Sequence, residues 1–457
     1  MSRHHRDGRA LPGEEHLMTR LSRRSVLLGG VGAAGMAALA GCTASGRSSA
    51  EPMQFWHFLS GGDGVTMQGL IDDVNADQNA YAVRPTVLAW GAPYYTKLAM
   101  AGAGGRAPEL AMMHSARVPG YAPGGLLDPW DLDLLSEYGV TEEDFSGPVW
   151  ESTIVDGDIF GVALDAHPFI CLYNTEICDA AGVLDSGGRL LRPGSPEDYL
   201  AMCREIAGHA EGHALSYGFL GEGPQMWRLF YTLYAQHGKE MEFPQRGAAQ
   251  IDGDAFVSSL ELMHSIADDE IAASRGNEDS AIAEFAAGQS GMHYTGVWEL
   301  VTMKDAGVPV DAGMIPPIFG NEAVYADSHS FVLPHQSSPD REMRGHAYAL
   351  VAQLLRRSYD WAGAGHIPAY LPVTEGQEYK ELLPQAHYAE AADHLVYDPP
   401  AWFTGSGSNF HLDFGQIVGS AITSGSGYDE AFESFQRHVD RILSRPNPAN
   451  PEEGSDD

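Results

Sequence analysis

The segment at residues 60–64, Ser-Gly-Gly-Asp-Gly, places one acidic side chain in a glycine-rich loop just before an expected helix. Free N–H groups at a helix N-terminus can donate hydrogen bonds to a ligand. A phosphate-binding loop would end with a lysine and a hydroxyl, whereas this loop carries Asp63 and no cation. The segment therefore favours a ligand whose hydroxyl groups contact Ser60 and Asp63, and capping of the helix by Asp63 is the alternative.

Tryptophan supplies a second kind of binding group, a flat apolar face. The chain contains eight tryptophans, and several stand at the ends of expected strands or helices. Such faces suit the C–H faces of sugar rings, while carboxylates and imidazoles suit the hydroxyl groups. Core packing is the competing interpretation for each tryptophan.

Three histidines, His167, His329 and His366, lie in polar loops. Asp165 and Asp327 stand two residues before the first two of them, so a dispersed metal site is one hypothesis. Hydrogen bonding to a polar ligand, or between lobes, is the interpretation we favour. We predict no metal and no cofactor.

The sequence contains no G-x-S-x-G nucleophile motif and no Walker or Rossmann fingerprint. A pair of carboxylates for glycoside hydrolysis cannot be selected among 62 acidic residues, because their separation is a three-dimensional quantity. We therefore predict a binding protein rather than an enzyme.

Alternating strand and helix patterns must position these residues. A compact apolar run at 53–59 predicts a strand, and Met67, Leu70, Ile71 and Val74 recur at helical spacing. Further strands are expected at 82–90, 109–113, 159–164, 169–173, 291–295 and 330–333, with a loop between the fourth and fifth. Further helices are expected at 94–100, from 195, at 255–266, 281–287, 346–356 and 428–443. The alternation predicts an α/β fold, and 457 residues exceed the roughly 250–300 at which single cores stop growing, which indicates two lobes.

The N-terminal segment has the pattern of an export signal. Six arginines precede an uncharged run that is shorter than the roughly 20 residues of a membrane-spanning helix. Residues 22–28 (SRRSVLL) resemble a twin-arginine signal, and residues 39–42 (LAGC) resemble a lipobox. We expect removal of residues 1–41, lipidation of Cys42 and a flexible tether over 42–51. An ordinary export signal followed by a free thiol is the alternative.

Acidic residues strongly outnumber basic ones, with 62 Asp and Glu against 27 Lys and Arg and a formal net charge of −35. Removal of an arginine-rich signal makes the remaining chain more acidic still. This charge repels phosphate backbones and therefore argues against nucleic-acid binding. It also favours a neutral ligand over an anionic one. Of the four cysteines, Cys171, Cys178 and Cys203 remain if Cys42 carries lipid, and both a disulfide and buried reduced thiols are open.

Short segments spread along the chain carry a resemblance to a known family. They lie at 55–64, 95–98 (YTKL), 107–110 (APEL), 161–168 (GVALDAHP), 173–175 (YNT), 285–299, 326–329 (ADSH) and 364–368 (AGHIP). In order and spacing they resemble extracellular solute-binding proteins of bacterial ABC transporters, in the carbohydrate-binding family that includes the maltose-binding protein. Ala163 and Thr175 stand where this family often has proline and lysine, respectively. These departures affect the local backbone and one surface charge.

The resemblance implies two α/β lobes, in a periplasmic-binding-protein-like fold, joined by hinge crossings near Leu164, Asp327 and Pro368. A neutral sugar or oligosaccharide would be trapped in the cleft between the lobes and delivered to the permease subunits of the transporter. The protein would be a monomer, anchored by Cys42 to the outer face of the bacterial cell membrane. The ligand-binding residues implied are Trp56, Ser60, Asp63, Trp90, Asp165, His167, Trp227, Trp298, Asp327, His329, His366, Tyr370 and Trp402.

The lobes implied are residues 52–164 with 327–367 and residues 165–326 with 368–444, followed by a disordered acidic tail over 445–457. Two other functions stay open. One is a secreted carbohydrate-active hydrolase that uses two acids, and the other is a metal-binding protein built on His167, His329 and His366.

Overall fold

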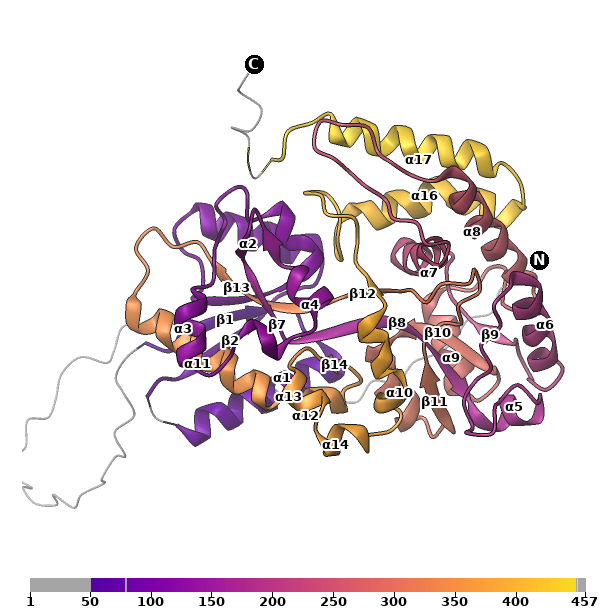
Figure 1. Ribbon diagram of the computed structural model, residues 1–457, viewed down its shortest axis with the longest axis horizontal. Helices are drawn as coiled ribbons and strands as arrows, with labels where there is room; N and C mark the ends of the chain where they lie inside the picture. The colour runs from indigo at the N-terminus through magenta and orange to yellow at the C-terminus, as the bar shows by residue number, and fades with distance from the viewer. Residues whose placement is uncertain (1–50, 79, 449, 451–457) are drawn as a thin grey trace, which may run out of the picture. The chain divides into compact units, whose positions relative to one another are not determined.

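Two mixed β-sheets organise the chain in the computed structural model, which describes residues 51–78, 80–448 and 450 (Figure 1). These residues belong to one compact unit, Ser48–Asp457. The expected signal, the lipidated Cys42 and nearly all of the tether lie outside the described residues.

The first sheet has the strand order β2-β1-β3-β13-β4, and β7 also pairs with β13. Its strands are β1 (Met53–His57), β2 (Val83–Val87), β3 (Leu110–His114), β4 (Leu127–Asp128), β7 (Gly161–Ala163) and β13 (His329–Pro334). β1 runs parallel to β2 and β3, whereas β13 is antiparallel to its neighbours. The helices that follow or pack near these strands are α1 (Gly61–Asp77), α2 (Ala92–Ala103), α3 (Leu132–Glu137), α4 (Gly147–Glu151), α11 (Arg341–Arg356) and α12 (Ser358–Gly363).

The second sheet has the order β15-β12-β8-β10-β9, and β11 and β14 also pair with β8. Its strands are β8 (Asp165–Asn174), β9 (Leu215–Ser216), β10 (Met292–Gly296), β11 (Val310–Gly313), β12 (Val324–Asp327), β14 (Ile367–Pro368) and β15 (Leu395–Val396). A separate hairpin pairs β5 (Ile154–Val155) with β6 (Asp158–Ile159).

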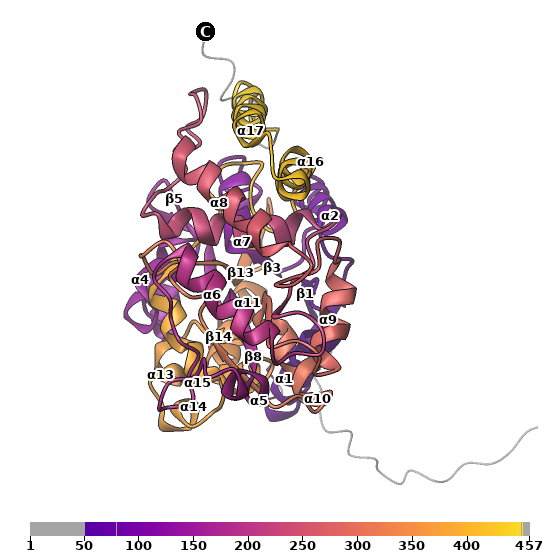
Figure 2. The ribbon, with the colours of Figure 1, turned by 90° about the vertical axis from the view of Figure 1, so that its right-hand side faces the viewer.

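Most of the remaining helices accompany the second sheet. The remaining α-helices are α5 (Thr175–Ala180), α6 (Pro196–Ala207), α7 (Gly223–Gln236), α8 (Gly253–Ile266), α9 (Glu278–Ala286), α10 (Leu300–Asp305), α13 (Leu371–Thr374), α14 (Gln377–Lys380), α15 (Gln385–Tyr388), α16 (Asn409–Ser424) and α17 (Tyr428–Leu443). Short 3-10 helices occur at η1 (Ser115–Gly120), η2 (Glu142–Asp144), η3 (Val297–Glu299) and η4 (Ala389–Asp393). Figure 2 shows α7, α8, α16 and α17 gathered on one side of the second sheet, where they pack against one another.

The chain passes between the sheets three times. β7 leads into β8 through Leu164, β12 leads into β13 through Ser328, and α12 leads into β14 through residues 364–366. β8 also links the two hydrophobic cores: Ile170 and Leu172 pack into the core of the first sheet, while alternate β8 residues pack into that of the second. This follows from the two-residue period of a strand.

Most expected elements are confirmed. The stripe from Met67 to Val74 is the buried face of α1, and Ser195 caps α6 by accepting a hydrogen bond from the Asp198 N–H. The prediction of a loop at 165–168, between two strands, is wrong, because these residues begin the ten-residue strand β8. There His167 and Pro168 pair with β12, a neighbour far away in sequence.

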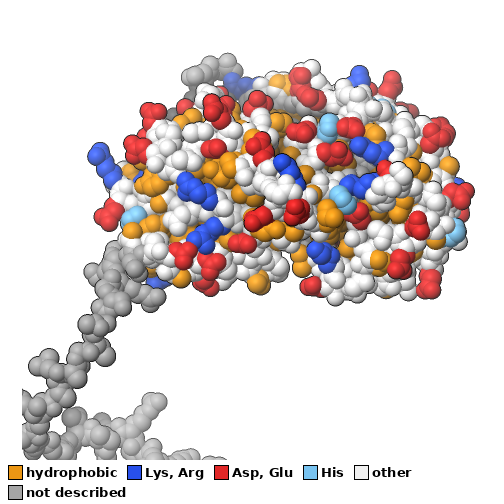
Figure 3. All heavy atoms as spheres, turned by 60° about the horizontal axis from the view of Figure 1, so that its bottom comes forward, with side chains coloured by type: hydrophobic (Ala, Val, Ile, Leu, Met, Phe, Trp, Pro, Cys, Tyr) orange, Lys and Arg blue, Asp and Glu red, His pale blue; other side chains and the backbone are white. Residues whose placement is uncertain are grey.

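Three further features concern the cysteines, the apolar character of the helices and the surface charge. Cys171, Cys178 and Cys203 are buried free thiols, and burial raises the pKa of each. Among the described residues, no helix is both long and apolar enough to cross a bilayer. Carboxylates are dispersed over the face shown in Figure 3 rather than gathered in one patch.

Candidate functional site

A cavity of about 500 Å³, which we call the polar cavity, lies between elements of the two sheets. Its walls come from the start of α1, the end of β3, the starts of β8 and β13, and the region of α7, α9 and η3. The lining residues are Phe58, Leu59, Ser60, Gly61, Gly62, Asp63, Trp90, His114, His167, Glu222, Pro224, Arg228, Glu278, Trp298, Glu299, Thr302, His329 and Ser406.

Beside this cavity, a buried carboxylate gathers donors from all three crossings. We call Asp165, His167, His329 and His366 the crossing cluster. The Asp165 carboxylate lies 3.0 Å from His167 Nδ1 and 2.7 Å from His329 Nδ1, and it accepts the His329 backbone N–H at 2.9 Å. Trp361 Nε1 donates to it at 2.7 Å. The carboxylate thus ties β8, β13 and α12 together.

His366 connects this cluster to the cavity wall. Its Nε2 lies 3.1 Å from the Asp63 carboxylate, and its Nδ1 lies 3.1 Å from Asp165. Burial alone would lower the pKa of His366, but the two carboxylates raise it to about 10. Asp63 therefore does not cap α1, whose N-cap is Ser60 without a side-chain hydrogen bond.

The members of the crossing cluster differ in protonation state. Burial alone would raise the pKa of Asp165, but the imidazoles of His329, His366 and His167 hold it well below its usual value. His167 is different, because burial and the neighbouring His329 lower its pKa to about 4. At neutral pH the cluster contains an ionised Asp165, a protonated His366 and a neutral His167.

Two glycines allow the backbone to reach these positions. Gly365 has φ +109°, and a Cβ atom there would lie 2.2 Å from the Val297 carbonyl oxygen. A side chain at Gly296 would collide with the Trp298 ring. Glycine is therefore required just before His366 and two residues before Trp298.

The opposite wall combines an aromatic face with a cation. The Arg228 guanidinium lies 4.8 Å from the centroid of the Trp298 ring and donates to the Gln225 side chain at 3.3 Å. Trp298 in turn meets the His167 ring edge to face, with 6.1 Å between centroids. Trp90, from the first-sheet side, is 47% exposed and leaves an open aromatic surface.

The structure brings a subset of the predicted residues to the polar cavity. Ser60, Asp63, Trp90, His167, Trp298 and His329 line it, whereas Asp165 and His366 stand behind its wall. Asp327 is also fully buried, and it accepts the Ala116 and Ser328 N–H groups.

Four predicted residues are not brought to this cavity. Trp227 is fully buried in the second core, stacked on Tyr231, and Trp56 lies in a groove beneath Lys97. Tyr370 is buried against Phe145. The fourth, Trp402, lines a different cavity.

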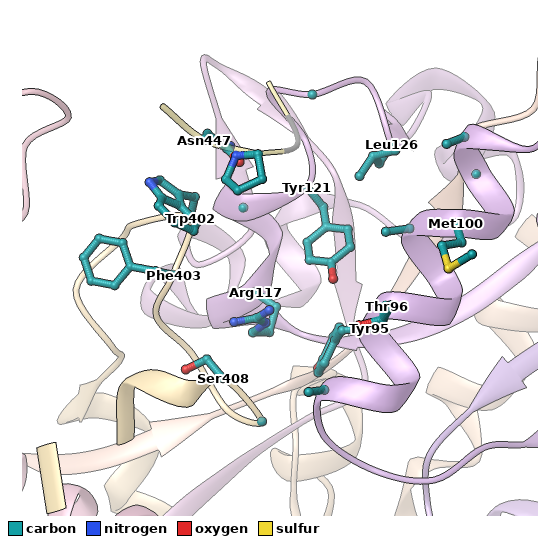
Figure 4. Close-up of a pocket in the computed structure, with 18 of the residues that line it drawn as sticks. Tyr95, Thr96, Met100, Arg117, Tyr121, Leu126, Trp402, Phe403, Ser408 and Asn447 are labelled. Carbon is teal, nitrogen blue, oxygen red and sulfur yellow. The ribbon is translucent and has the colours of Figure 1, made fainter. Parts of the chain in front are cut away.

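That second cavity, which we call the aromatic cavity, has a volume of about 1020 Å³. Figure 4 shows Trp402 and Phe403 on one side of it, Tyr95 and Tyr121 on the other, and Arg117 between them. Arg117 lies 4.7 Å from the Tyr95 ring centroid and donates to the Thr404 carbonyl at 2.7 Å. Residues 445, 447 and 448, which were expected in a disordered tail, also line this cavity.

Sequence reasoning missed His114, Glu222, Arg228, Glu278, Glu299 and Thr302 in the polar cavity. A signal existed for Arg228, because it is the one charged residue in the apolar run of α7. Burial raises the pKa of Glu299 and of Glu222, with neighbouring carboxylates adding to the effect.

Two α/β lobes, three crossings and a polar cavity lined from both lobes define the class of two-lobe ligand-binding proteins. The family model described as bacterial extracellular solute-binding protein matches residues 69–381, and the chain belongs to this family. A search of curated proteins gives no match.

Solved structures show the same fold at low identity. The sugar-binding protein MalE from Xanthomonas citri is 15% identical with a TM-score of 0.73, over 86% of this chain and 98% of that one. UgpB from Mycobacterium tuberculosis, solved with glycerophosphocholine, is 16% identical with a TM-score of 0.72, over 87% and 99%. A cyclic alpha-maltosyl-1,6-maltose binding protein from Arthrobacter globiformis is 18% identical with a TM-score of 0.67, over 86% and 99%. The predicted fold class and family are confirmed.

Proposed function

We propose that the protein captures a neutral sugar or oligosaccharide in the polar cavity and delivers it, chemically unchanged, to the permease of an ABC importer. The observation that carries this proposal is the meeting of aromatic faces and fixed polar groups in one cavity. Trp298 and Trp90 suit C–H faces of sugar rings, and Asp63, Glu278 and His329 suit hydroxyl groups.

The charge of the cavity supports a neutral ligand. Among the described residues that line it, Arg228 is the single Lys or Arg, and Asp63, Glu222, Glu278 and Glu299 are acidic. Arg228 is already engaged by Trp298 and Gln225. A phosphodiester such as glycerophosphocholine, with which UgpB was solved, would meet more negative than positive charge here.

The experiment is a calorimetric titration of the full chain against maltose, maltotriose, a cyclic oligosaccharide and glycerophosphocholine. We expect saturable binding of at least one sugar and none of glycerophosphocholine. W298A should weaken sugar binding by about 30-fold or more, since a central aromatic contact is worth about 2 kcal/mol. W56A is the matched control, because Trp56 is also half-buried beneath a cation but lies outside the cavity. Equal losses in both variants would contradict the site, and cleavage products would favour the hydrolase.

We further propose that the mature protein starts at Cys42, carries lipid there and works as a monomer on the outer face of the membrane. The lipobox at 39–42 and the extracellular family support this proposal. A C42A variant should appear in the culture medium instead of the membrane fraction. Retention of C42A in the membrane would contradict the anchor, and a twin-arginine route predicts loss of export after R23K/R24K.

A further inference from the structure

The crossing cluster has the composition and placement of a metal centre. Asp165 and His167 begin β8, His329 begins β13, and His366 immediately precedes β14. One potential ligand atom from each of these four buried residues lies within 4.8 Å of the others. One ion would therefore contact all three crossings at once.

The spacing suits a small divalent ion. Bonds of about 2.0–2.1 Å to a tetrahedral ion separate the ligand atoms by about 3.3 Å. The Asp165 carboxylate lies 3.0 Å from His167 Nδ1, 2.7 Å from His329 Nδ1 and 3.1 Å from His366 Nδ1. One ligand atom from each of the four residues lies within 4.8 Å of the others, so inward shifts of about 1 Å would bring these atoms close to the separation of about 3.3 Å.

One nitrogen in the cluster lacks a hydrogen bond. His366 Nδ1 is fully buried and close to Asp165, but the angles do not meet those of a hydrogen bond. Orphaned polar atoms at such depth are rare, and a role in binding an ion is one of the accepted reasons for them. A metal ion would bind this nitrogen in place of the proton that it carries.

The surroundings supply the outer contacts that metal sites need. Histidine ligands usually donate their second ring nitrogen to a carboxylate, and Asp63 lies 3.1 Å from His366 Nε2. The Trp361 indole donates to Asp165 and fixes its orientation. His167 and His329 line the polar cavity, which provides a route of entry.

We propose that Asp165, His167, His329 and His366 bind one divalent transition-metal ion, and that Zn²⁺ is the ion their donors favour. Three imidazoles and one carboxylate match the ligand preference of Zn²⁺ better than that of Ca²⁺ or Mg²⁺, which take oxygen ligands. This goes against the sequence-based expectation of no metal. It is independent of the identity of the cavity ligand.

The test uses the full chain, stripped with a chelator and titrated with Zn²⁺ against a chromophoric competitor. We expect one Zn²⁺ per chain and no competition from millimolar Ca²⁺ or Mg²⁺. Replacement by Co²⁺ should give the visible absorption of tetrahedral coordination, a readout that needs no mutation. Less than one ion per folded chain, or an octahedral Co²⁺ spectrum, would overturn the proposal.

Substitutions in and around the crossing cluster test whether the ion binds there. H167Q and H329Q should each remove the stoichiometric site, and D63N should weaken it by about 10–100-fold, as outer contacts do. H213Q is the matched control, because His213 also pairs with a carboxylate, Glu284, at 2.8 Å but lies just before β9, at the edge of the second sheet. Circular dichroism verifies folding of each variant. Tight Zn²⁺ binding that survives H167Q and H329Q would place the ion elsewhere and refute the cluster as its site. Sugar titrations of the stripped protein keep this result separate from the proposed function.

Discussion

Two buried histidines, His366 and His293, differ in charge: the first is protonated at neutral pH and the second is neutral. His366 lies at the third crossing between Asp63 and Asp165, and these carboxylates raise its pKa to about 10. His293 lies within β10, where Ser216 provides the hydrogen bonds, and burial lowers its pKa to about 4. Both side chains are almost completely buried. The difference shows that two flanking carboxylates can outweigh the effect of burial on the pKa of a histidine.

The two histidines also differ in their structural roles. A neutral His293 needs only a hydrogen bond and contributes to the packing of the second sheet, where it stacks on Phe285. The charged His366 compensates carboxylates that would otherwise repel each other behind the cavity wall. If the crossing cluster binds a divalent ion as proposed, the ion would take over this compensation from the proton on His366.

Removal of the central carboxylate should have the largest effect. D165N, in chelator-treated protein, leaves His366 with one carboxylate and deprives His329 and His167 of a charged acceptor. Breaking a buried ion pair costs about 3–5 kcal/mol, so the free energy of unfolding should fall by about that amount. Urea unfolding at pH 7 measures it.

The control for this change is D311N. Asp311 also pairs with a histidine, His387 at 2.7 Å, but both side chains are partly exposed. Exposed pairs contribute about 0–1 kcal/mol, so D311N should be nearly neutral. Similar losses in D165N and D311N would show that the buried carboxylate has no special role.

Acid should destabilise the folded protein through the buried, neutral His293. The unfolded chain protonates His293 near pH 6.5, whereas the folded chain does so only near pH 4. The unfolded state therefore binds more protons between these values, and stability present above pH 6.5 is lost as the pH falls toward 4. Protonation of this one histidine lowers the free energy of unfolding by about 3 kcal/mol.

The variant H293Q isolates this contribution. Unfolding free energies at pH 7.5, 6 and 5 should decline less steeply in H293Q than in the wild type, because glutamine does not titrate. H209Q changes an exposed histidine and should keep the wild-type slope. A wild-type slope in H293Q would contradict the depressed pKa.

The elements that sequence periodicity predicted well are those whose pattern is local. The buried stripe of α1 and the cap of α6 depend on residues within one or two turns. The start of β8 was missed because proline and polar residues favour a loop there, whereas pairing with β12 and β14 holds it extended. Such partners are distant in sequence and leave no local signal.

The candidate site shows the same limit at the level of single side chains. Trp227 and Arg228 are adjacent on α7, and a rotation of about 100° per residue turns one into the core and the other to the cavity. Which of them faces the cavity depends on the packing of α7 against α16, which a single sequence does not reveal. Ser60 and Asp63 were found because they lie in a glycine-rich loop between a predicted strand and a predicted helix. His167 and His329 were found because they lie next to hinge crossings that the resemblance implied.

The smallest effect should come from the indole that supports the cluster. W361F removes the donor to the charged Asp165, whereas W130F removes a donor to the neutral Phe331 carbonyl at 3.1 Å. Both tryptophans are buried and lose the same volume, so the cavity terms largely cancel. Hydrogen bonds to charged groups contribute about 1 kcal/mol more than neutral ones, and W361F should be the less stable variant by about that amount in urea unfolding. If W130F were equally or more destabilised, Asp165 would not carry the charge that sets the surroundings of His366 apart from those of His293.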